Sequence, residues 1–215
     1  MANIRKEFCG RFKNIKGKTL VGLTGAAASG KSAALGFFRE AGAFCVSTDA
    51  LAKEVLTSGA CYNRILRKFG SRVFLKDGSI ARNKLAAEVF SDKASRKRLE
   101  NILHPEILKR TLSLIKKSHE TIIVVEVPLL FETGLEDCFD LTICVESPGD
   151  LRMERAARRG WSRKEMRARG AAQLPAGKKA ALSDIVIVNR GSLADLRREV
   201  KRVYGFLNSA ITEKK

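Results

Sequence analysis

The residues best suited to chemistry lie together in one short loop. Residues 25–32 read Gly-Ala-Ala-Ala-Ser-Gly-Lys-Ser, which fits the phosphate-binding pattern G-x-x-x-x-G-K-[ST]. In such a loop, successive backbone N–H groups surround an anion, and the following helix points the positive end of its dipole at the same anion. Lys31 then reaches the β- and γ-phosphates, and the Ser32 hydroxyl ligates Mg²⁺. The pattern predicts that the chain holds a nucleoside triphosphate with Mg²⁺.

The elements on either side of the loop support this interpretation. Residues 19–23 form an apolar run that predicts a buried strand, and residues 32–41 predict a helix that ends at Gly42. Strand, loop and helix in this order are what the motif requires. The alternative, an incidental turn rich in Gly, Ala and Ser, is disfavoured by these flanks.

Two acidic residues follow other predicted strands. Asp49 comes after a strand at 43–46, and Glu126 lies near the end of a strand at 121–127. Ligands of doubly wound sheets bind at the carboxyl ends of the strands. Asp49 could therefore accept the proton of a hydroxyl that attacks the γ-phosphate, or it could cap the helix that follows. Glu126 could hold Mg²⁺ through water, or it could cap a local turn.

Arginine and lysine side chains gather between residues 152 and 169. Arg152, Arg155 and Arg159 share one helix face, and residues 162–165 form a capping box that starts a second helix. Two arginine-rich helices across a glycine hinge predict a lid that closes over phosphates, because guanidinium forks suit the charge on a transferring phosphoryl group. A solvated basic face is the alternative.

The apolar runs predict the fold. Five of them read as strands, at residues 19–23, 43–46, 121–127, 141–145 and 185–188. The runs are continuous rather than alternating at 122–125 and 185–188, which is typical of parallel strands covered on both faces. We therefore predict an α/β fold, a three-layer sandwich of the P-loop NTPase type with a five-stranded parallel sheet. A last helix begins at a capping signal, Ser192 with Asp195, and is expected to bury one face, made of Leu193, Leu196, Val200, Val203 and Leu207.

The stretch between the second and third strands is too long for one crossover helix. Helices are predicted over 51–56, 62–69, 83–90 and 92–103, with a turn at 76–79. His104-Pro105 is expected to end one helix and begin the next. We interpret residues 51–118 as a helical insertion that holds the acceptor substrate, with a purely structural insertion as the alternative. The core then comprises 19–50, 119–150 and 171–215, the lid 151–170.

The net charge of the chain limits the kinds of partner that it can bind. The chain carries 41 Lys and Arg against 23 Asp and Glu, a formal charge of +18, which favours polyanionic partners. A basic surface without a dedicated partner is the alternative, and we do not expect nucleic acid to be the partner.

The five cysteines are scattered without C-x-x-C spacing, so neither a disulfide framework nor a zinc site is predicted.

The sequence also bears on targeting. Residues 1–18 are basic but lack the apolar stretch of a secretory leader, and no run approaches the length of a membrane span. We expect a cytoplasmic protein whose first 18 residues form a frayed or loosely docked extension.

The chain resembles the dephospho-CoA kinases, a family of P-loop enzymes similar to nucleoside monophosphate kinases. The resemblance covers about residues 21–207. It rests on an ordered set of residues: the loop at 22–32, the segment 49–55, Phe69-Gly70, Asp77-Gly78, Arg82, His104-Pro105, the distinctive Pro-Leu-Leu-Phe-Glu at 128–132, the lid residues Arg155, Arg159, Arg169 and Gln173, and Lys179, Asp184, Asn189 and Gly191 near the end.

The resemblance implies a reaction and a set of roles. The reaction is ATP-dependent phosphorylation of the ribose 3′-hydroxyl of dephospho-CoA, giving CoA and ADP, the last step of coenzyme A biosynthesis. Its partners are dephospho-CoA and ATP, with Mg²⁺. The implied catalytic residues are Asp49, Lys31 and Arg155, and Ser32 is the implied metal ligand. ATP is implied to bind Gly25, Ala26, Ala27, Ala28, Ser29, Gly30, Lys31, Ser32, Ala33, Arg159 and Asn189, and the acceptor to bind Asp49, Lys53, Arg82 and His104.

Departures from the family pattern keep two other functions open. Ala26 and Ala28 stand where the family usually has glycine, and Ser47 stands where it usually has a second Asp. If either alanine needs a positive φ, its backbone is strained. The alternatives are another small-molecule or nucleotide kinase, and a degenerate P-loop protein that binds without catalysis. The two alanines favour the degenerate protein, whereas Lys31, Ser32, Asp49 and the lid arginines argue against it.

Overall fold

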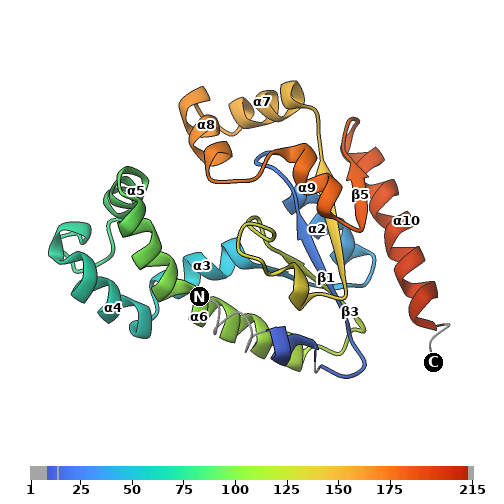
Figure 1. The fold of residues 1–215 in the computed structure, drawn as a ribbon, viewed down its shortest axis with the longest axis horizontal. Helices are drawn as coiled ribbons and strands as arrows, with labels where there is room; N and C mark the ends of the chain where they lie inside the picture. Colours follow the sequence, from blue (N-terminus) through green and yellow to red (C-terminus); the bar gives the residue numbers. More distant parts are fainter. Residues whose placement is uncertain (1–8, 14, 213–215) are drawn as a thin grey trace.

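A computed structural model describes residues 9–13 and 15–212, with residues 90, 91 and 93 described by their backbone only. Within this part of the chain one parallel sheet contains β1 (Thr19–Thr24), β2 (Phe44–Ser47), β3 (Ile122–Glu126), β4 (Leu141–Glu146) and β5 (Ile185–Val188). The strand order is β2-β3-β1-β4-β5, so β1 is central (Figure 1). The predicted α/β fold with a five-stranded parallel sheet is confirmed, and each strand bound lies within one residue of its prediction.

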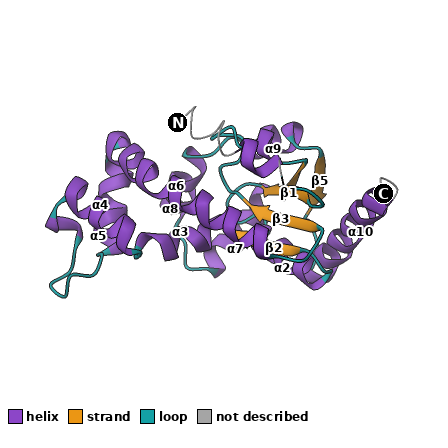
Figure 2. Cartoon of the chain, turned by 90° about the horizontal axis from the view of Figure 1, so that it is seen from below, coloured by secondary structure: helices purple, strands orange, loops and turns teal. Residues whose placement is uncertain are grey.

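Helices connect the strands. They are α2 (Lys31–Glu40), α3 (Thr48–Leu56), α4 (Gly59–Phe69), α5 (Arg82–Ser91), α6 (Lys93–Lys117), α7 (Gly149–Arg158), α8 (Arg163–Ala171), α9 (Ala176–Leu182) and α10 (Leu193–Thr212), with short 3₁₀ turns at Ser71–Val73 and Glu136–Cys138. Helices α4 and α5 lie far from the sheet, whereas α6 returns toward it (Figures 1 and 2). No helix of the described residues is both long and apolar enough to cross a membrane.

Both faces of the sheet are buried, which makes the sandwich three layers thick. Leu20 of β1 packs in a cluster with side chains of α3 and α6, whereas Val21 packs on the opposite face with α2 and α10. The register repeats this alternation, because Leu20 pairs with Ile123 and Val21 pairs with Val124. Strands covered on both faces need apolar residues at every position, which explains the continuous runs.

Helix α10 buries the predicted face with one exception. Ser192 and Asp195 form the expected cap, in which the Ser192 N–H and hydroxyl donate to Asp195 Oδ2. Leu196, Val200, Val203 and Leu207 are buried, but Leu193, the first residue of the helix, is 66% exposed. Helical periodicity identifies a shared face but cannot tell at which turn the neighbouring helix begins to cover it.

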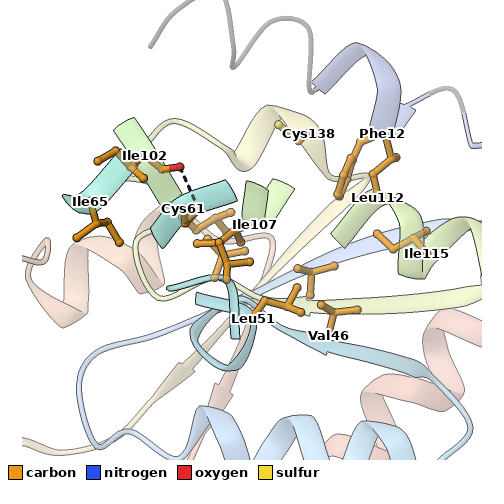
Figure 3. Close-up of a cluster of buried hydrophobic side chains, with 14 of the residues drawn as sticks. Phe12, Val46, Leu51, Cys61, Ile65, Ile102, Ile107, Leu112, Ile115 and Cys138 are labelled. Atoms are coloured by element: carbon orange, nitrogen blue, oxygen red, sulfur yellow. Dashed lines mark hydrogen bonds between the residues drawn. The ribbon is translucent and has the colours of Figure 1, made fainter. Parts of the chain in front are cut away.

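Helix α6 runs without a break through Pro105, so the predicted helix end at His104-Pro105 is wrong. A proline inside a helix has no N–H for the carbonyl four residues earlier, here that of Asn101. That carbonyl accepts instead from Arg64 Nη2 at 3.3 Å. The Ile102 carbonyl accepts from Arg64 Nη1 at 3.4 Å and from Cys61 Sγ at 3.7 Å, the latter drawn in Figure 3. Donors from α4 replace the missing bond, and the helix continues.

The described part of the N-terminal extension is packed on the core. Phe12 is 1% exposed and meets Phe139 edge-on, with ring centroids 5.9 Å apart. Phe12 lies beside Leu112 of α6 in Figure 3. A disulfide joins Cys9 to Cys138, whose Cα atoms are 4.2 Å apart. The predictions of a loosely docked extension and of no disulfide are therefore wrong here; residues 1–8 and 14 lie outside the described part.

Candidate active site

The phosphate loop connects the central strand β1 to α2, and two of its glycines are required by its geometry. Gly25 has φ +146°, and a Cβ there would lie 2.3 Å from the Val145 carbonyl oxygen. Gly30 has φ +104°, and its Cβ would lie 2.3 Å from Asn189 Nδ2. A side chain at either position would meet backbone or a buried amide. The loop can therefore close tightly at the start of α2, where free N–H groups and the helix dipole favour an anion.

One of the two unusual alanines has a strained backbone. Ala28 has φ +60°, and it is the one non-glycine residue with positive φ in the described part of the chain. Ala26 does not have a positive φ. The left-handed region costs a residue with a Cβ about 1–2 kcal/mol. The expected strain is present at Ala28 alone, and the loop keeps its fold despite it.

Lys31 is folded back over the loop. Its Nζ donates to the Gly25 carbonyl at 3.0 Å and to the Ala26 carbonyl at 2.8 Å. Burial is the main cause that lowers the pKa of Lys31, to about 8, and the carboxylate of Glu126 is the main opposing influence. Asp49 also raises this pKa through its charge, so Asp49 lies within electrostatic reach of the ammonium group.

Glu126 joins the ends of two strands to the phosphate loop. Its side chain is buried at the end of β3. Oε1 accepts from the Ser32 hydroxyl at 3.2 Å, and Oε2 accepts from the Ser47 hydroxyl at 2.9 Å. A hydroxyl and a carboxylate side by side are the hard oxygen donors that Mg²⁺ prefers. The sequence left Glu126 open between a role in holding Mg²⁺ through water and a turn cap; the structure places its carboxylate beside the Ser32 and Ser47 hydroxyls.

Asp49 lies in the first turn of α3 and is not the cap of that helix. The cap is Ser47, whose side-chain oxygen accepts from the Ala50 N–H. The interpretation of Asp49 as a helix cap is therefore wrong. Its exposed side chain lines a cavity. Asp49 thus lines the cavity and also acts through its charge on Lys31.

The cavity holds about 540 Å³, within the usual range for a small-molecule site. It lies between α3, α6 and the loop after β3. Its walls are mostly apolar and comprise Thr48, Asp49, Ala52, Arg96, Leu99, Glu100, Asn101, Leu103, His104, Pro105, Ile107, Leu108, Val127, Pro128, Leu129, Thr133 and Leu135. Burial lowers the pKa of His104, with Glu100 opposing. Of the four predicted acceptor residues, Asp49 and His104 line this cavity, whereas Lys53 and Arg82 are exposed and do not.

Arg155 and Asn189 hold the phosphate loop from the side of β5. Asn189 Nδ2 donates to the Ser29 carbonyl at 2.8 Å. Arg155 Nη2 donates to Asn189 Oδ1 at 3.2 Å, and Nη1 donates to the Ser147 hydroxyl at 2.9 Å and to the Ser29 carbonyl at 3.5 Å. The structure therefore brings Arg155 and Asn189 to the loop, as the sequence led us to expect. Ser147 was missed because nothing marks it locally.

Helices α7 and α8 form the arginine-rich unit at the loop's edge. They are joined at Gly160, which has φ +74°, and α8 begins with the predicted capping box of Ser162 and Glu165. Ala156 and Met166 pack with Ala27 and Ala28 of the phosphate loop. In Figure 1 these helices stand beside the phosphate loop that follows β1.

Arg159, a predicted nucleotide contact, lies against Trp161, which packs on the cluster that contains Ala27 and Ala28. Its guanidinium carbon is 5.8 Å from the centroid of the Trp161 ring, and that of Arg169 is 4.1 Å from the same ring. Trp161 therefore makes cation–π contacts with two arginines. Ala33, the last residue predicted to contact ATP, lies half-buried on the first turn of α2.

Three polar residues at the site had no assigned role in the sequence interpretation. Gln173 Oε1 accepts from the Ala27 N–H at 3.1 Å. Lys179 is fully buried and forms an ion pair of 2.9 Å with Glu132. The family resemblance was the available signal, because its segments include Gln173, Glu132 and Lys179. A local pattern could not predict their contacts, because each contact joins residues that are far apart in the sequence.

Known proteins share this arrangement. A family model described as dephospho-CoA kinase matches residues 19–195, from β1 to the first turn of α10. The chain belongs to the dephospho-CoA kinase family. A family member from Anaeromyxobacter dehalogenans is 38% identical over 190 residues, which cover 86% of this chain and 90% of the relative.

Solved structures agree with the family assignment. A Thermus thermophilus protein superposes with a TM-score of 0.79 at 34% identity, covering 88% of this chain and 98% of its own. A dephospho-CoA kinase from Campylobacter jejuni superposes with a TM-score of 0.65 at 28% identity, covering 90% and 98%. Members of the family are ATP-dependent kinases, so this chain is a phosphotransferase.

Proposed function

We propose that this chain transfers the γ-phosphoryl group of ATP to the ribose 3′-hydroxyl of dephospho-CoA, giving CoA and ADP. The observation that carries the proposal is the position of Asp49. Its carboxylate lines the acceptor-sized cavity and its charge acts on Lys31 of the phosphate loop. A hydroxyl held in the cavity beside Asp49 would thus face the terminal phosphate.

Residues of the phosphate loop and the arginine-rich unit would hold the donor. Backbone N–H groups of residues 25–33 would bind the phosphates, and Lys31 would release the carbonyls of Gly25 and Ala26 to reach the β- and γ-phosphates. Arg155 already lies at the loop, where its fork can neutralise charge on the transferring group. Arg159 and Asn189 would contribute to nucleotide binding.

The oxygen donors at the start of α2 and at the end of β3 fit Mg²⁺. Ser32 would ligate the ion directly, and Glu126 would hold one of its waters, since the two side chains are 3.2 Å apart. The ion would neutralise charge on the β- and γ-phosphates during transfer. With Ser32 Oγ bound to the ion, Glu126 would still accept the hydrogen bond from Ser47, which would hold the carboxylate in place.

Asp49 would act as the general base, which accepts the proton of the attacking hydroxyl. His104 would contact the acceptor as a neutral imidazole, because burial lowers its pKa. Lys53 and Arg82 would meet only the parts of the acceptor that extend beyond the cavity, since both are exposed. Residues 51–118 would form the acceptor-binding insertion and residues 151–170 the lid, and the reaction would take place in the cytoplasm.

The acceptor identity can be tested by ADP release from ATP and Mg²⁺ with purified protein. Dephospho-CoA should support turnover, whereas AMP and uridine should not. Turnover with AMP or uridine alone would show another kinase activity and overturn the proposal. Tight ATP binding without turnover on any of the three would instead support a degenerate, non-catalytic P-loop protein.

A further inference from the structure

Two consecutive residues just after α8 contact the two substrate sites separately. The Ala27 N–H of the phosphate loop donates to Gln173 Oε1 at 3.1 Å. The Leu174 N–H donates to Glu132 Oε1 at 2.6 Å. Glu132 belongs to the loop after β3, whose residues Pro128, Leu129 and Thr133 line the acceptor cavity. One peptide unit therefore lies between the donor loop and the acceptor wall.

A buried ion pair extends this connection. Lys179 Nζ lies 2.9 Å from Glu132 Oε1, and the two side chains are 0% and 15% exposed. Lys179 also donates to the Pro128 carbonyl, which accepts from the Thr24 hydroxyl at 3.5 Å. Thr24 is the last residue of β1, directly before the phosphate loop. The contacts thus form a ring that begins and ends at the donor loop and passes through the acceptor wall.

The ring has an unused acceptor. Glu132 Oε2 is buried and has no hydrogen-bond partner among the described residues. Buried carboxylate oxygens are normally satisfied, and leaving one unpaired is costly. If the Leu174 N–H is displaced, it can therefore move from Oε1 to Oε2 of Glu132 and remain hydrogen-bonded to the same carboxylate.

The contact of Gln173 competes with nucleotide. A phosphate-binding loop works by pointing its backbone N–H groups at the anion, and Ala27 is one of these residues. Here its N–H is satisfied by an uncharged amide oxygen instead. Phosphate oxygens carry negative charge and make stronger hydrogen bonds than an amide oxygen. Nucleotide would therefore displace Gln173 from the loop.

We propose that Gln173, Glu132 and Lys179 are positioning residues that couple nucleotide binding to the shape of the acceptor cavity. Displacement of Gln173 shifts the peptide to Leu174, and Glu132 and Lys179 carry that shift to Pro128 in the cavity wall. Nucleotide binding then tightens acceptor binding, and by linkage the acceptor tightens nucleotide binding by the same factor. The inference rests on the proposed function in taking ATP as donor and dephospho-CoA as acceptor.

The test is the coupling factor between the two ligands. Calorimetry would give the Kd of dephospho-CoA with and without a non-hydrolysable ATP analogue and Mg²⁺, and the Kd of the analogue alone. The full-length protein should show a coupling factor of about fivefold or more, the usual lower range. Gln173→Ala should bind the analogue about two- to tenfold more tightly, since one competing hydrogen bond is lost, and its coupling factor should fall toward one.

Two neighbouring lysines provide a matched control. Lys179→Met removes the buried member of the ring, and Lys178→Met makes the same change at an exposed position of α9. Lys179→Met should abolish the coupling, whereas Lys178→Met should keep the wild-type factor. Lys179→Met could also fail to fold, because it leaves Glu132 without its ion pair. Glu132→Gln, which keeps the shape of the side chain, would then decide whether the ring carries the coupling.

The outcomes separate this inference from the proposed function. A wild-type protein that does not bind dephospho-CoA would contradict the proposed function, and the analogue affinity of Gln173→Ala would still decide whether Gln173 competes at Ala27. A wild-type protein that turns over dephospho-CoA, with Gln173→Ala unchanged in analogue affinity and in coupling factor, would overturn the inference alone.

Discussion

The Ser32 hydroxyl donates to Oε1 of Glu126 across 3.2 Å, although the two residues are 94 positions apart in the chain. The contact exists because β1 and β3 are neighbouring parallel strands, with Leu23 paired to Glu126. Parallel pairing brings the carboxyl ends of both strands to one edge of the sheet, where the phosphate loop begins. The hydroxyl of Ser32 and the carboxylate of Glu126 therefore meet without any local signal that pairs them.

Glu126→Gln should weaken Mg²⁺ binding and slow the reaction. The amide keeps the size of the side chain but loses the charge that would hold a water of the ion. We expect the Mg²⁺ concentration for half-maximal ADP release to rise about 10- to 100-fold, as for other groups that support metal ligands. Glu120→Gln, at an exposed position before β3, is the control. An unchanged Mg²⁺ dependence in Glu126→Gln would exclude the carboxylate from the metal site.

Asp49→Asn should lower kcat by about 10²-fold or more, the usual contribution of a general base. The Kd of ATP should change little, because Asp49 lines the acceptor cavity and not the phosphate loop. Steady-state ADP release and calorimetry with the ATP analogue measure the two effects. Glu54→Gln, on the same helix and exposed, should leave both unchanged. A near-normal kcat in Asp49→Asn would remove this residue from the role of base.

Ala28→Gly and Ala26→Gly form a matched pair, because both methyl groups are buried and only Ala28 has a positive φ. Glycine at position 28 relieves about 1–2 kcal/mol of strain from the left-handed backbone of the folded state. This gain offsets the loss of stability that comes from the greater conformational entropy of glycine in the unfolded chain. Glycine at position 26 brings the entropic cost of about 0.4–1 kcal/mol without relief. Urea unfolding should show Ala28→Gly to be the more stable variant by about 1 kcal/mol. The reverse order would mean that position 28 is not strained.

ATP binding should be accompanied by proton uptake in mildly alkaline solution. Burial lowers the pKa of Lys31 to about 8 from 10.5 in the ATP-free protein, and phosphate charge should raise it again. At about pH 8.5 about three quarters of the Lys31 side chains are then neutral before binding and charged after it, so uptake should be about three quarters of a proton. At about pH 7 Lys31 is already charged, and its uptake should be small. Calorimetry in two buffers of different ionisation enthalpy measures this number.

The same shift predicts how stability depends on pH. The folded ATP-free protein releases the Lys31 proton more readily than the unfolded chain does. Between about pH 8 and 10.5 the unfolded chain therefore binds more protons at this residue, and the Lys31 contribution to the free energy of unfolding rises with pH. Lys31→Met should remove this contribution, as measured by urea unfolding across that range. Identical pH dependence in both proteins would contradict the burial of a charged Lys31.

Local patterns predicted the elements of the site well. The strand, glycine loop and helix at 19–41 depend on residues next to one another, and continuous apolar runs located all five strands. The position of Asp49 after a predicted strand marked it as a site residue. The sequence could not decide whether Asp49 also caps α3, because Ser and Asp are both good cap residues and the structure uses Ser47.

Contacts between distant segments could not be predicted. Pro105 reads as a helix break unless Arg64 is known to supply donors to the carbonyls beside it. Lys179 is one of 41 basic residues, and only the fold shows that it is fully buried beside Glu132. The pairing of Cys9 with Cys138 spans 129 residues. Each of these depends on which helices and loops the topology places together, which no single stretch of sequence contains.

The central claim, phosphoryl transfer to the ribose 3′-hydroxyl beside Asp49, is tested most directly with two deoxy acceptors. ADP release would be measured with dephospho-CoA, its 2′-deoxy analogue and its 3′-deoxy analogue, each with ATP and Mg²⁺. We predict turnover with dephospho-CoA and with the 2′-deoxy compound, and none with the 3′-deoxy compound, although it still binds. Turnover of the 3′-deoxy compound at the rate of dephospho-CoA would contradict the account.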